Sequence, residues 1–237
     1  MSALARTAKT GSDPFVPAGA LRCGGYIHPV KPENIELLKA GLTELGMTPP
    51  AEALTRLIGY HDFLLEYNLK VNLTGFKDER ESVIKNLLNA LAPWRKIDAS
   101  RATVDIGTGG GVPGIPLAIM LGMDRMTLIE SKQKKCDFLR AACEKFAPRV
   151  QVLHADVNSV HRQFGQVVSI AYGTLAKLVQ ATDDMRAPGT RIIAWKGRKE
   201  TVDAEIPECR KPFRKWKVEP FSVPGLEAER HICILQV

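Results

Sequence analysis

A cluster of glycines between two apolar segments is the part of this sequence with the clearest chemical meaning. The apolar segment 104–106 is followed by Gly107, Gly109, Gly110, Gly111 and Gly114, and then by the apolar segment 115–121. Residues without side chains allow a tight turn and a close approach to a ligand, and the start of a helix presents free N–H groups. This order predicts a strand, a loop and a helix that bind a nucleotide-like ligand.

Two ligand classes fit this loop. The spacing Gly109-x-Gly111-x-x-Gly114 matches the dinucleotide-binding pattern, which is weak when it stands alone. The spacing Gly107-x-Gly109-x-Gly111, with Asp105 two residues before it, better fits the loop of S-adenosylmethionine (SAM) methyltransferases. SAM has no phosphate but carries an ammonium and a sulfonium group, which an acidic residue beside the loop suits.

Two more acidic residues follow the next predicted strands. Segment 126–130 ends in Glu130, which can accept hydrogen bonds from ribose hydroxyls, and segment 150–154 is followed by Asp156, which can accept from an adenine amino group. Acidic residues at three successive strand ends favour SAM over a dinucleotide. The alternative is that all three are carboxylates of ordinary loops and helix caps.

Several motifs in order resemble one known family, the small-subunit ribosomal RNA methyltransferase G family (RsmG, also called GidB). The similarity runs from about residue 33 to the C-terminus, and it rests on the segments 67–75 (YNLKVNLTG), 105–117 (DIGTGGGVPGIPL), 128–135 (LIESKQKK) with 138–140 (FLR), 195–197 (WKG) and 229–231 (ERH). Ordered motifs at compatible spacing are far more specific than one glycine loop.

The resemblance implies an α/β class I SAM-dependent methyltransferase, Rossmann-like, with a seven-stranded, mostly parallel sheet and an N-terminal helical extension. It implies SAM as cofactor and 16S rRNA, at a guanine N7, as substrate. The cofactor-binding residues it implies are Asp105, Gly107, Gly109, Gly111, Val112, Glu130, Lys134, Asp156, Val157, Asn158 and Ile170. Lys196 and Arg230 are the candidates for holding a phosphate or base near the sulfonium, and Lys132, Lys135, Arg198 and Lys199 are further candidate RNA contacts.

The sequence also departs from the family pattern at predicted cleft positions. Segment 85–90 reads KNLLNA where the family usually has an Arg-His…Asp-Ser run, and Ile170 stands where an arginine is expected. Gly165, Asp156 and Asn158 are further departures. One explanation is that another cation replaces the missing arginine, with Lys134 and Arg230 as candidates. The others are that the protein methylates another RNA site or a small molecule, or that it has lost catalytic turnover. A non-catalytic RNA-binding or assembly protein is the second function class.

The order of segments predicts three parts. We expect a flexible basic arm at residues 1–32 and a helical subdomain with three apolar stripes at residues 33–98. The SAM-binding domain, in which strands and helices alternate, is expected at residues 99–237. Within the helical part, Asp78 and Glu81 predict a capping box, and His61 on an apolar stripe predicts a core histidine rather than a ligand.

Charge and cysteine usage limit the function classes. The chain has 33 basic and 26 acidic residues and a formal net charge of +7, which suits an anionic partner such as rRNA or a ribosomal particle. The basic stretch 196–217, with interleaved aromatic residues, adds to this expectation. Five cysteines without a Cys-x-x-Cys pair predict neither disulfides nor zinc. We expect no metal, no membrane span, a cytoplasmic location and a monomer.

Overall fold

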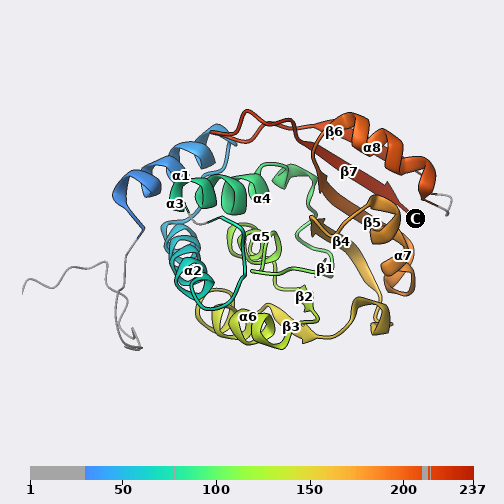
Figure 1. Cartoon of the computed structure of the whole chain (residues 1–237), viewed down its shortest axis with the longest axis horizontal. Helices are drawn as coiled ribbons and strands as arrows, with labels where there is room; N and C mark the ends of the chain where they lie inside the picture. The colour runs from blue at the N-terminus through green and yellow to red at the C-terminus, as the bar shows by residue number, and fades with distance from the viewer. Residues whose placement is uncertain (1–29, 77, 210–212, 214) are drawn as a thin grey trace, which may run out of the picture.

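A single mixed sheet organises the structure, a computed structural model that describes residues 30–76, 78–209, 213 and 215–237 (Figure 1). Among these residues seven strands are hydrogen-bonded in the order β3-β2-β1-β4-β5-β7-β6. The strands are β1 Thr103–Ile106, β2 Met126–Glu130, β3 Gln151–His154, β4 Phe164–Ile170, β5 Arg186–Lys196, β6 Lys215–Pro220 and β7 His231–Gln236. The predicted seven-stranded, mostly parallel sheet is therefore confirmed.

The pairing pattern places the carboxyl ends of the first five strands at one edge. Strands β1 to β5 pair in parallel, whereas β7 pairs antiparallel with both β5 and β6. Lys196, at the end of β5, lies opposite His231, which in turn lies opposite Pro220 at the end of β6. In open α/β sheets, ligands bind at the edge where the parallel strands end.

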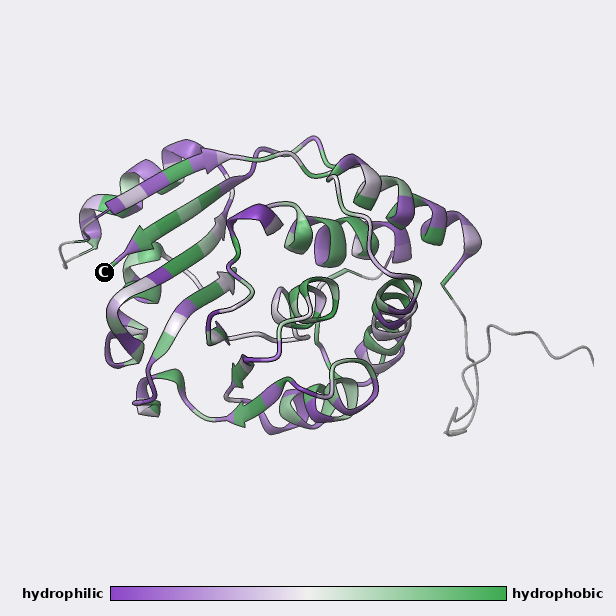
Figure 2. Ribbon diagram, turned by 180° about the vertical axis from the view of Figure 1, so that it is seen from behind, coloured by the Kyte–Doolittle hydropathy of each residue, from purple (hydrophilic) through white to green (hydrophobic). Residues whose placement is uncertain are grey.

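Alternation along the strands divides the apolar residues between two faces, each covered by helices (Figure 2). Val167 and Ile192 belong to the core under α7 (Leu175–Ala181) and α8 (Lys199–Glu205). The next residues, Val168 and Ile193, belong to the core on the opposite face. That second core also includes side chains of α5 (Gly114–Leu121) and α6 (Gln133–Phe146).

The N-terminal helices extend this second core. They are α1 Pro32–Glu44, α2 Ala51–Asn68, α3 Glu79–Ser82, a π-helical turn at Val83–Leu88 and α4 Asn89–Leu91. Leu57 of α2 and Leu87 are fully buried in the same cluster as Leu117 and Phe138. Residues on both sides of the boundary predicted near residue 98 therefore share one hydrophobic core.

Most of the predicted details agree with the structure. Asp78 caps α3 by accepting a hydrogen bond from the Glu81 N–H at 2.8 Å. The Glu81 side chain forms an ion pair with Lys85 instead of reaching back to the Asp78 N–H, so only half of the predicted capping box is found in the described residues. His61 is 1% exposed, and its Nε2 lies 2.9 Å from the Ser82 hydroxyl, as expected for a core histidine. Burial lowers its pKa to about 4, so the ring is neutral at physiological pH.

The predicted arm 1–32 needs a correction at its end. Residues 1–29 lie outside the described part of the chain. Val30, however, is 5% exposed and its N–H donates to Asp62 at 2.8 Å, while Lys31 N–H donates to Glu79 at 2.7 Å. Helix α1 then begins at Pro32, because proline is tolerated in the first turn of a helix. Residues 30–32 are therefore anchored to the helical layer.

Candidate active site

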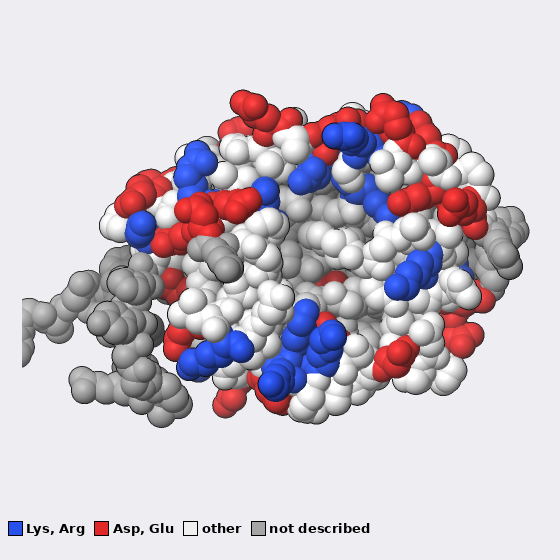
Figure 3. Space-filling view, viewed as in Figure 1, with Lys and Arg blue, Asp and Glu red and all other residues white. Residues whose placement is uncertain are grey.

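Two cavities meet at the carboxyl edge of the sheet. The larger, of about 580 Å³, lies between the glycine loop, the ends of β4 and β5, the non-helical residues Thr74 and Phe76, and the helical residues Lys85, Asn86 and Asn89. The smaller, of about 220 Å³, lies at the ends of β2 and β3. Gly107 and Tyr172 line both cavities. The space-filling view shows a hollow in the middle of this face, with basic side chains on several sides of its rim (Figure 3).

Asp105 holds the glycine loop together from inside. Its Oδ2 accepts hydrogen bonds from the Thr108 hydroxyl at 2.6 Å and from the Gly114 N–H at 2.9 Å. The side chain is fully buried, and burial raises its pKa to about 7, although these two hydrogen bonds oppose the rise. We expected Asp105 to face the ammonium of a ligand, but the structure uses it to link β1 to the start of α5.

The loop glycines have different reasons for lacking a side chain. Gly107 and Gly109 line the larger cavity with φ values of 62° and 58°, in the left-handed region that favours glycine. A Cβ on Gly109 would find no protein atom closer than 3.7 Å. A Cβ on Gly111, in contrast, would lie 2.5 Å from Ile115, and Gly111 is not among the residues that line either cavity. Gly111 thus permits helix packing, and Gly109 leaves space for a ligand.

The smaller cavity is lined by five of the predicted cofactor residues: Gly107, Glu130, Asp156, Val157 and Asn158. Glu130 Oε2 accepts a hydrogen bond from the Gly109 N–H at 3.1 Å, and its Oε1 accepts from two backbone N–H groups that follow β2. Asp156 caps the 3₁₀ turn Val157–Ser159 by accepting from the Asn158 N–H at 2.8 Å. Two carboxylates therefore face the small cavity.

The chain after β4 separates the two cavities. Ile170, the last residue of β4, lines the larger cavity with an aliphatic side chain that packs against the core. Ala171 has a φ of 58°, which is unusual for a residue with a Cβ, and Gly173 has a φ of 113°. Between them, the Tyr172 ring lies so close to Gly107 that an added Cβ there would be 2.7 Å from the ring.

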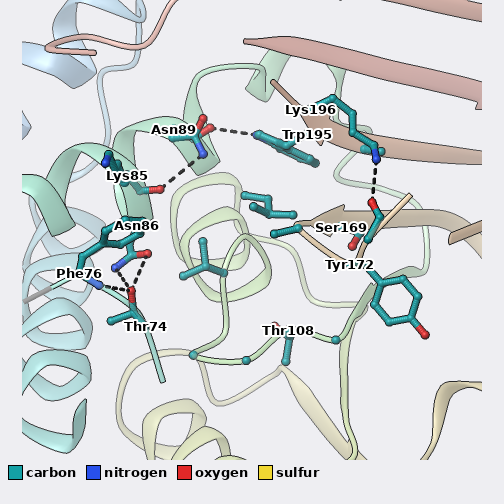
Figure 4. A pocket seen from close by; sticks show the side chains of 18 of the residues that line it. Thr74, Phe76, Lys85, Asn86, Asn89, Thr108, Ser169, Tyr172, Trp195 and Lys196 are labelled. Carbon is teal, nitrogen blue, oxygen red and sulfur yellow. Dashed lines mark hydrogen bonds between the residues drawn. The ribbon is translucent and has the colours of Figure 1, made fainter. Parts of the chain in front are cut away.

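The helical layer supplies a wall of the larger cavity that the sequence did not single out as a site. Asn86 and Asn89 line it and are less than a tenth exposed (Figure 4). The Asn86 amide donates to Ser82 at 2.9 Å and to Thr74 at 3.3 Å, and the Trp195 indole donates to the Asn89 carbonyl at 2.9 Å. Their positions were noticed only as departures from a family pattern, because the packing of these helices over the sheet edge is long-range.

An aromatic ring and a lysine lie on the same wall. Lys85 and Phe76 both line the larger cavity, and the Lys85 ammonium lies 4.9 Å from the centroid of the Phe76 ring. The ring is half-buried, which leaves part of its surface open to solvent.

Of the two candidate catalytic residues, one is already engaged. The Lys196 ammonium donates to the Gly173 carbonyl at 2.8 Å and to Glu205 at 2.6 Å, and its side chain is 12% exposed. Lys196 therefore lines the cavity as half of a buried ion pair, not as a free cation. Arg230 also lines the cavity, is half-buried, and donates from Nη1 to the Glu229 carbonyl at 2.9 Å.

The remaining predicted basic residues lie at different distances from the site. Lys135 is half-buried, and its ammonium lies 3.9 Å from the position of a Cβ on Gly109. Lys134 is exposed and has no atom within 4 Å of that position, so Lys135 takes the place beside the loop expected for Lys134, although neither lysine lines the two cavities. Lys132, Arg198 and Lys199 are exposed, and Lys199 forms an ion pair with Asp203 at 2.5 Å. Residues 210–212 and 214 of the basic stretch lie outside the described residues.

Neither a metal cluster nor a membrane helix is found in the described part of the chain. No group of three or more His, Cys, Asp or Glu side chains there is arranged to hold a metal ion. None of the described helices is long and apolar enough to cross a membrane.

Comparison with known proteins identifies the family. Residues 53–233 match the sequence model of a family described as rRNA small subunit methyltransferase G. This chain belongs to that family. A "Ribosomal RNA small subunit methyltransferase G" of Neisseria gonorrhoeae is 36% identical over 205 residues, which cover 86% of this chain and 98% of the relative. The protein of the same name from Pseudomonas aeruginosa is 32% identical, covering 87% and 97%. The predicted resemblance is thereby confirmed.

Two solved structures with similar folds and low sequence identity are named as methyltransferases. The SAM-dependent methyltransferase SibL superimposes with a TM-score of 0.54 and 14% identity, covering 86% of this chain and 74% of SibL. A methyltransferase from Pyrococcus furiosus gives a TM-score of 0.52 and 17% identity, covering 76% and 95%. These similarities support the class I methyltransferase fold that the glycine loop predicted.

Proposed function

We propose that this chain transfers a methyl group from SAM to N7 of a guanine in small-subunit rRNA. The observation that carries the proposal is the pair of cavities joined at Gly107 and Tyr172, in a member of a family named for methylation of small-subunit rRNA. The smaller cavity suits the nucleoside part of the cofactor, and the larger suits its amino-acid part together with the acceptor base.

The residues present fit such a cofactor. Glu130 and Asp156 offer carboxylate oxygens where ribose hydroxyls and an adenine amino group need acceptors, and Val157 offers an apolar surface for the base. Gly109 lines the larger cavity without a side chain, and the Lys135 ammonium lies beside it, where it can attract a carboxylate. Gly107, Val112 and Ile170 complete the wall of the larger cavity.

The chemistry asks little of the protein beyond alignment. The cofactor, when bound, supplies a methyl group already activated by its sulfonium. Guanine N7 has a free lone pair and no proton to lose, so no general base is required. The chain's own residues must therefore hold the base at the right distance and angle and exclude water, and such positioning alone can account for much of a rate enhancement.

The acceptor half of the cavity suits an unpaired base. Trp195 and Phe76 offer aromatic surface, and Asn86 and Asn89 offer amide groups, whereas Arg230 offers a cation. RNA helices hide their base edges in a deep, narrow groove, so we expect the target guanine in a loop or in a partly assembled particle. Lys132, Arg198 and Lys199 remain proposed contacts to the phosphate backbone.

The proposal is tested by methyl transfer from labelled SAM. Small ribosomal subunits that lack the modification are incubated with the protein, and the labelled nucleosides are then separated. We expect the label in 7-methylguanosine. Label in another nucleoside would mean another RNA site, and RNA binding without any transfer would mean an assembly protein. Tight binding of NAD(P)H without binding of SAM would contradict the cofactor assignment.

A further inference from the structure

We infer that the buried ion pair between Lys196 and Glu205 is a brace that positions the Tyr172 loop, residues 171–174, for cofactor binding. Neither residue then acts on the substrate; both are positioning residues. The inference rests on the proposed function for the identity of the cofactor, but on the geometry of the described residues for the role of the pair.

The contacts of this pair converge on the C-terminal end of the Tyr172 loop, at Gly173 and Leu175. Lys196 Nζ donates to the Gly173 carbonyl at 2.8 Å (Figure 4). Glu205 Oε2 accepts both from Lys196 Nζ at 2.6 Å and from the Leu175 N–H at 2.7 Å. The Lys196 ammonium, at the end of β5, thus holds the loop at Gly173. The Glu205 carboxylate, on α8, holds the first residue of α7.

The loop needs such support because its backbone conformation is unfavourable. Ala171 adopts a φ of 58° and Gly173 a φ of 113°. The left-handed region is unfavourable for a residue with a Cβ such as Ala171, and this conformation persists only when surrounding contacts hold it there. The Thr174 hydroxyl, which accepts from the Lys177 N–H at 3.2 Å, caps α7 but does not reach back to Ala171.

The loop in turn defines the site. Tyr172 lines both cavities, and its ring lies against Gly107 of the glycine loop. A ligand that extends from the smaller cavity to the larger must pass this contact. A shift of the Tyr172 loop by about 1 Å would therefore change the width of the passage, and misplacements of that size can cost about 100-fold in activity.

Burial of the pair also argues for a positioning role. The Lys196 and Glu205 side chains are 12% and 14% exposed. An ion pair that is removed from water loses hydration, and its replacement by apolar residues is often neutral or even stabilising. Stability is thus a weak reason for this pair, whereas the hydrogen bonds to Gly173 and Leu175 depend on it.

The experiment compares variants of Glu205 with a matched pair on the same helix. Asp203 and Lys199 form an exposed ion pair on α8, with side chains 49% and 54% exposed, which does not touch the Tyr172 loop.

In the full-length protein we would measure the dissociation constant of S-adenosylhomocysteine by calorimetry, and KM for SAM and kcat with small ribosomal subunits. Glu205→Leu should weaken cofactor binding and raise KM by about 10- to 100-fold, with a smaller effect on kcat. Glu205→Gln, which keeps an acceptor for the Leu175 N–H, should lie between this variant and the native protein. Asp203→Asn should match the native protein in its dissociation constant for S-adenosylhomocysteine, which does not involve the RNA contact proposed for Lys199.

The double variant Lys196→Met/Glu205→Leu separates positioning from the avoidance of an unpaired buried charge. It leaves no charge unpaired, yet it lacks the contacts to Gly173 and Leu175. Cofactor binding that stays weak in the double variant supports the brace, and binding restored to the native value overturns it. Native affinity in Glu205→Leu would also overturn it. Weak binding in Glu205→Leu, with native protein that binds the cofactor but methylates no ribosomal RNA, would leave the brace intact and refute the proposed substrate.

Discussion

Gly109 is a loop glycine that lines the larger cavity, and an added Cβ there would meet protein atoms only at ordinary van der Waals distance, 3.7 Å or more. Gly111 and Gly114 are packed more tightly, because an added Cβ would lie 2.5 Å from Ile115 and 2.3 Å from Leu128. We predict that Gly109→Val abolishes binding of SAM and of S-adenosylhomocysteine, because the isopropyl group occupies the cavity. Calorimetry measures the effect.

Gly122 provides the matched control for this variant. It also adopts a left-handed conformation, with a φ of 63°, and has no atom within 4 Å of an added Cβ, but it ends α5 and lines neither cavity. Gly122→Val should carry a similar backbone strain, about 1–2 kcal/mol in the free energy of unfolding, and retain cofactor binding. Equal loss of binding in both variants would show that strain, not occupation of the cavity, is responsible.

The buried side chain of Asp105 should make the stability of the protein depend on pH. Its pKa in the folded protein is raised from 3.8 to about 7 by burial, so between these values the folded state binds more protons than the unfolded state. Stability from this residue is therefore fully present below pH 4 and is lost as the pH rises toward 7. Between pH 5 and pH 8 this loss is about 2–3 kcal/mol.

The variant Asp105→Asn tests this sign. Asparagine keeps an acceptor for the Gly114 N–H but does not titrate, so the free energy of unfolding should fall less between pH 5 and pH 8 than in the native protein. Denaturant unfolding at several pH values measures the difference. Asp62, whose pKa burial also raises to about 7, remains in both proteins and contributes the same slope. Parallel pH profiles for the two proteins would contradict the prediction.

At the scale of single elements, helix geometry decides which lysine of α6 serves the glycine loop. The sequence pointed to Lys134, but neighbouring residues on a helix point in different directions. Only Lys135 of the two brings its ammonium near Gly109. We predict that Lys135→Met weakens SAM binding by about two- to fivefold, the size of an exposed ion pair, and that Lys134→Met leaves it unchanged. Calorimetry measures the SAM affinity of both variants. A larger loss of affinity in Lys134→Met than in Lys135→Met would assign the role to Lys134.

The elements themselves were largely predictable because apolar periodicity and glycine placement are local properties. The strand at 126–130 and the helix after the glycine loop lie where the sequence placed them. Strand β5 begins at Arg186, and its pairing with β4 is irregular between Phe164 and Gln166. Such an irregularity depends on the neighbouring strand and leaves no periodic pattern in the sequence.

The site was less predictable than the fold, because its contacts join distant elements. Glu130 and Asp156 could be found from their places after strands, since parallel strands end at one edge. The sequence predicted Lys196 as a cation available to the substrate, because nothing in its local sequence shows that its ammonium donates to Glu205, on the next helix, and to the Gly173 carbonyl. Asn86 and Asn89 reach the cavity only because the N-terminal helices pack over the sheet edge.

At the scale of the whole molecule, the position of basic residues matters more than their number. The basic stretch 196–217 begins at the cavity, but Lys215 pairs with Gln236, which pairs with Arg191 five residues before the end of β5. At about 3.3 Å per residue this places Lys215 roughly 16 Å from the cavity edge of the sheet. Part of the stretch that was expected to bind RNA therefore lies near the opposite edge.

This arrangement predicts that two groups of cations differ in their effect on RNA affinity. Lys132, Lys135 and Arg230 lie at or near the two cavities, whereas Lys215 and Lys217 lie on the outer strand β6. Each contact to a phosphate contributes about 0.7 to 0.9 to the slope of log affinity against log salt concentration. Replacing all three residues of the first group by glutamine should lower that slope by up to about 2–3 and weaken binding across RNA sequences. Replacing Lys215 and Lys217 by glutamine should leave the slope close to the native value.

Binding to transcribed 16S rRNA at several salt concentrations measures both variants. An equal or larger fall in the Lys215/Lys217 variant would mean that RNA follows the outer strand, and an unchanged slope in both would mean that neither group contacts phosphate.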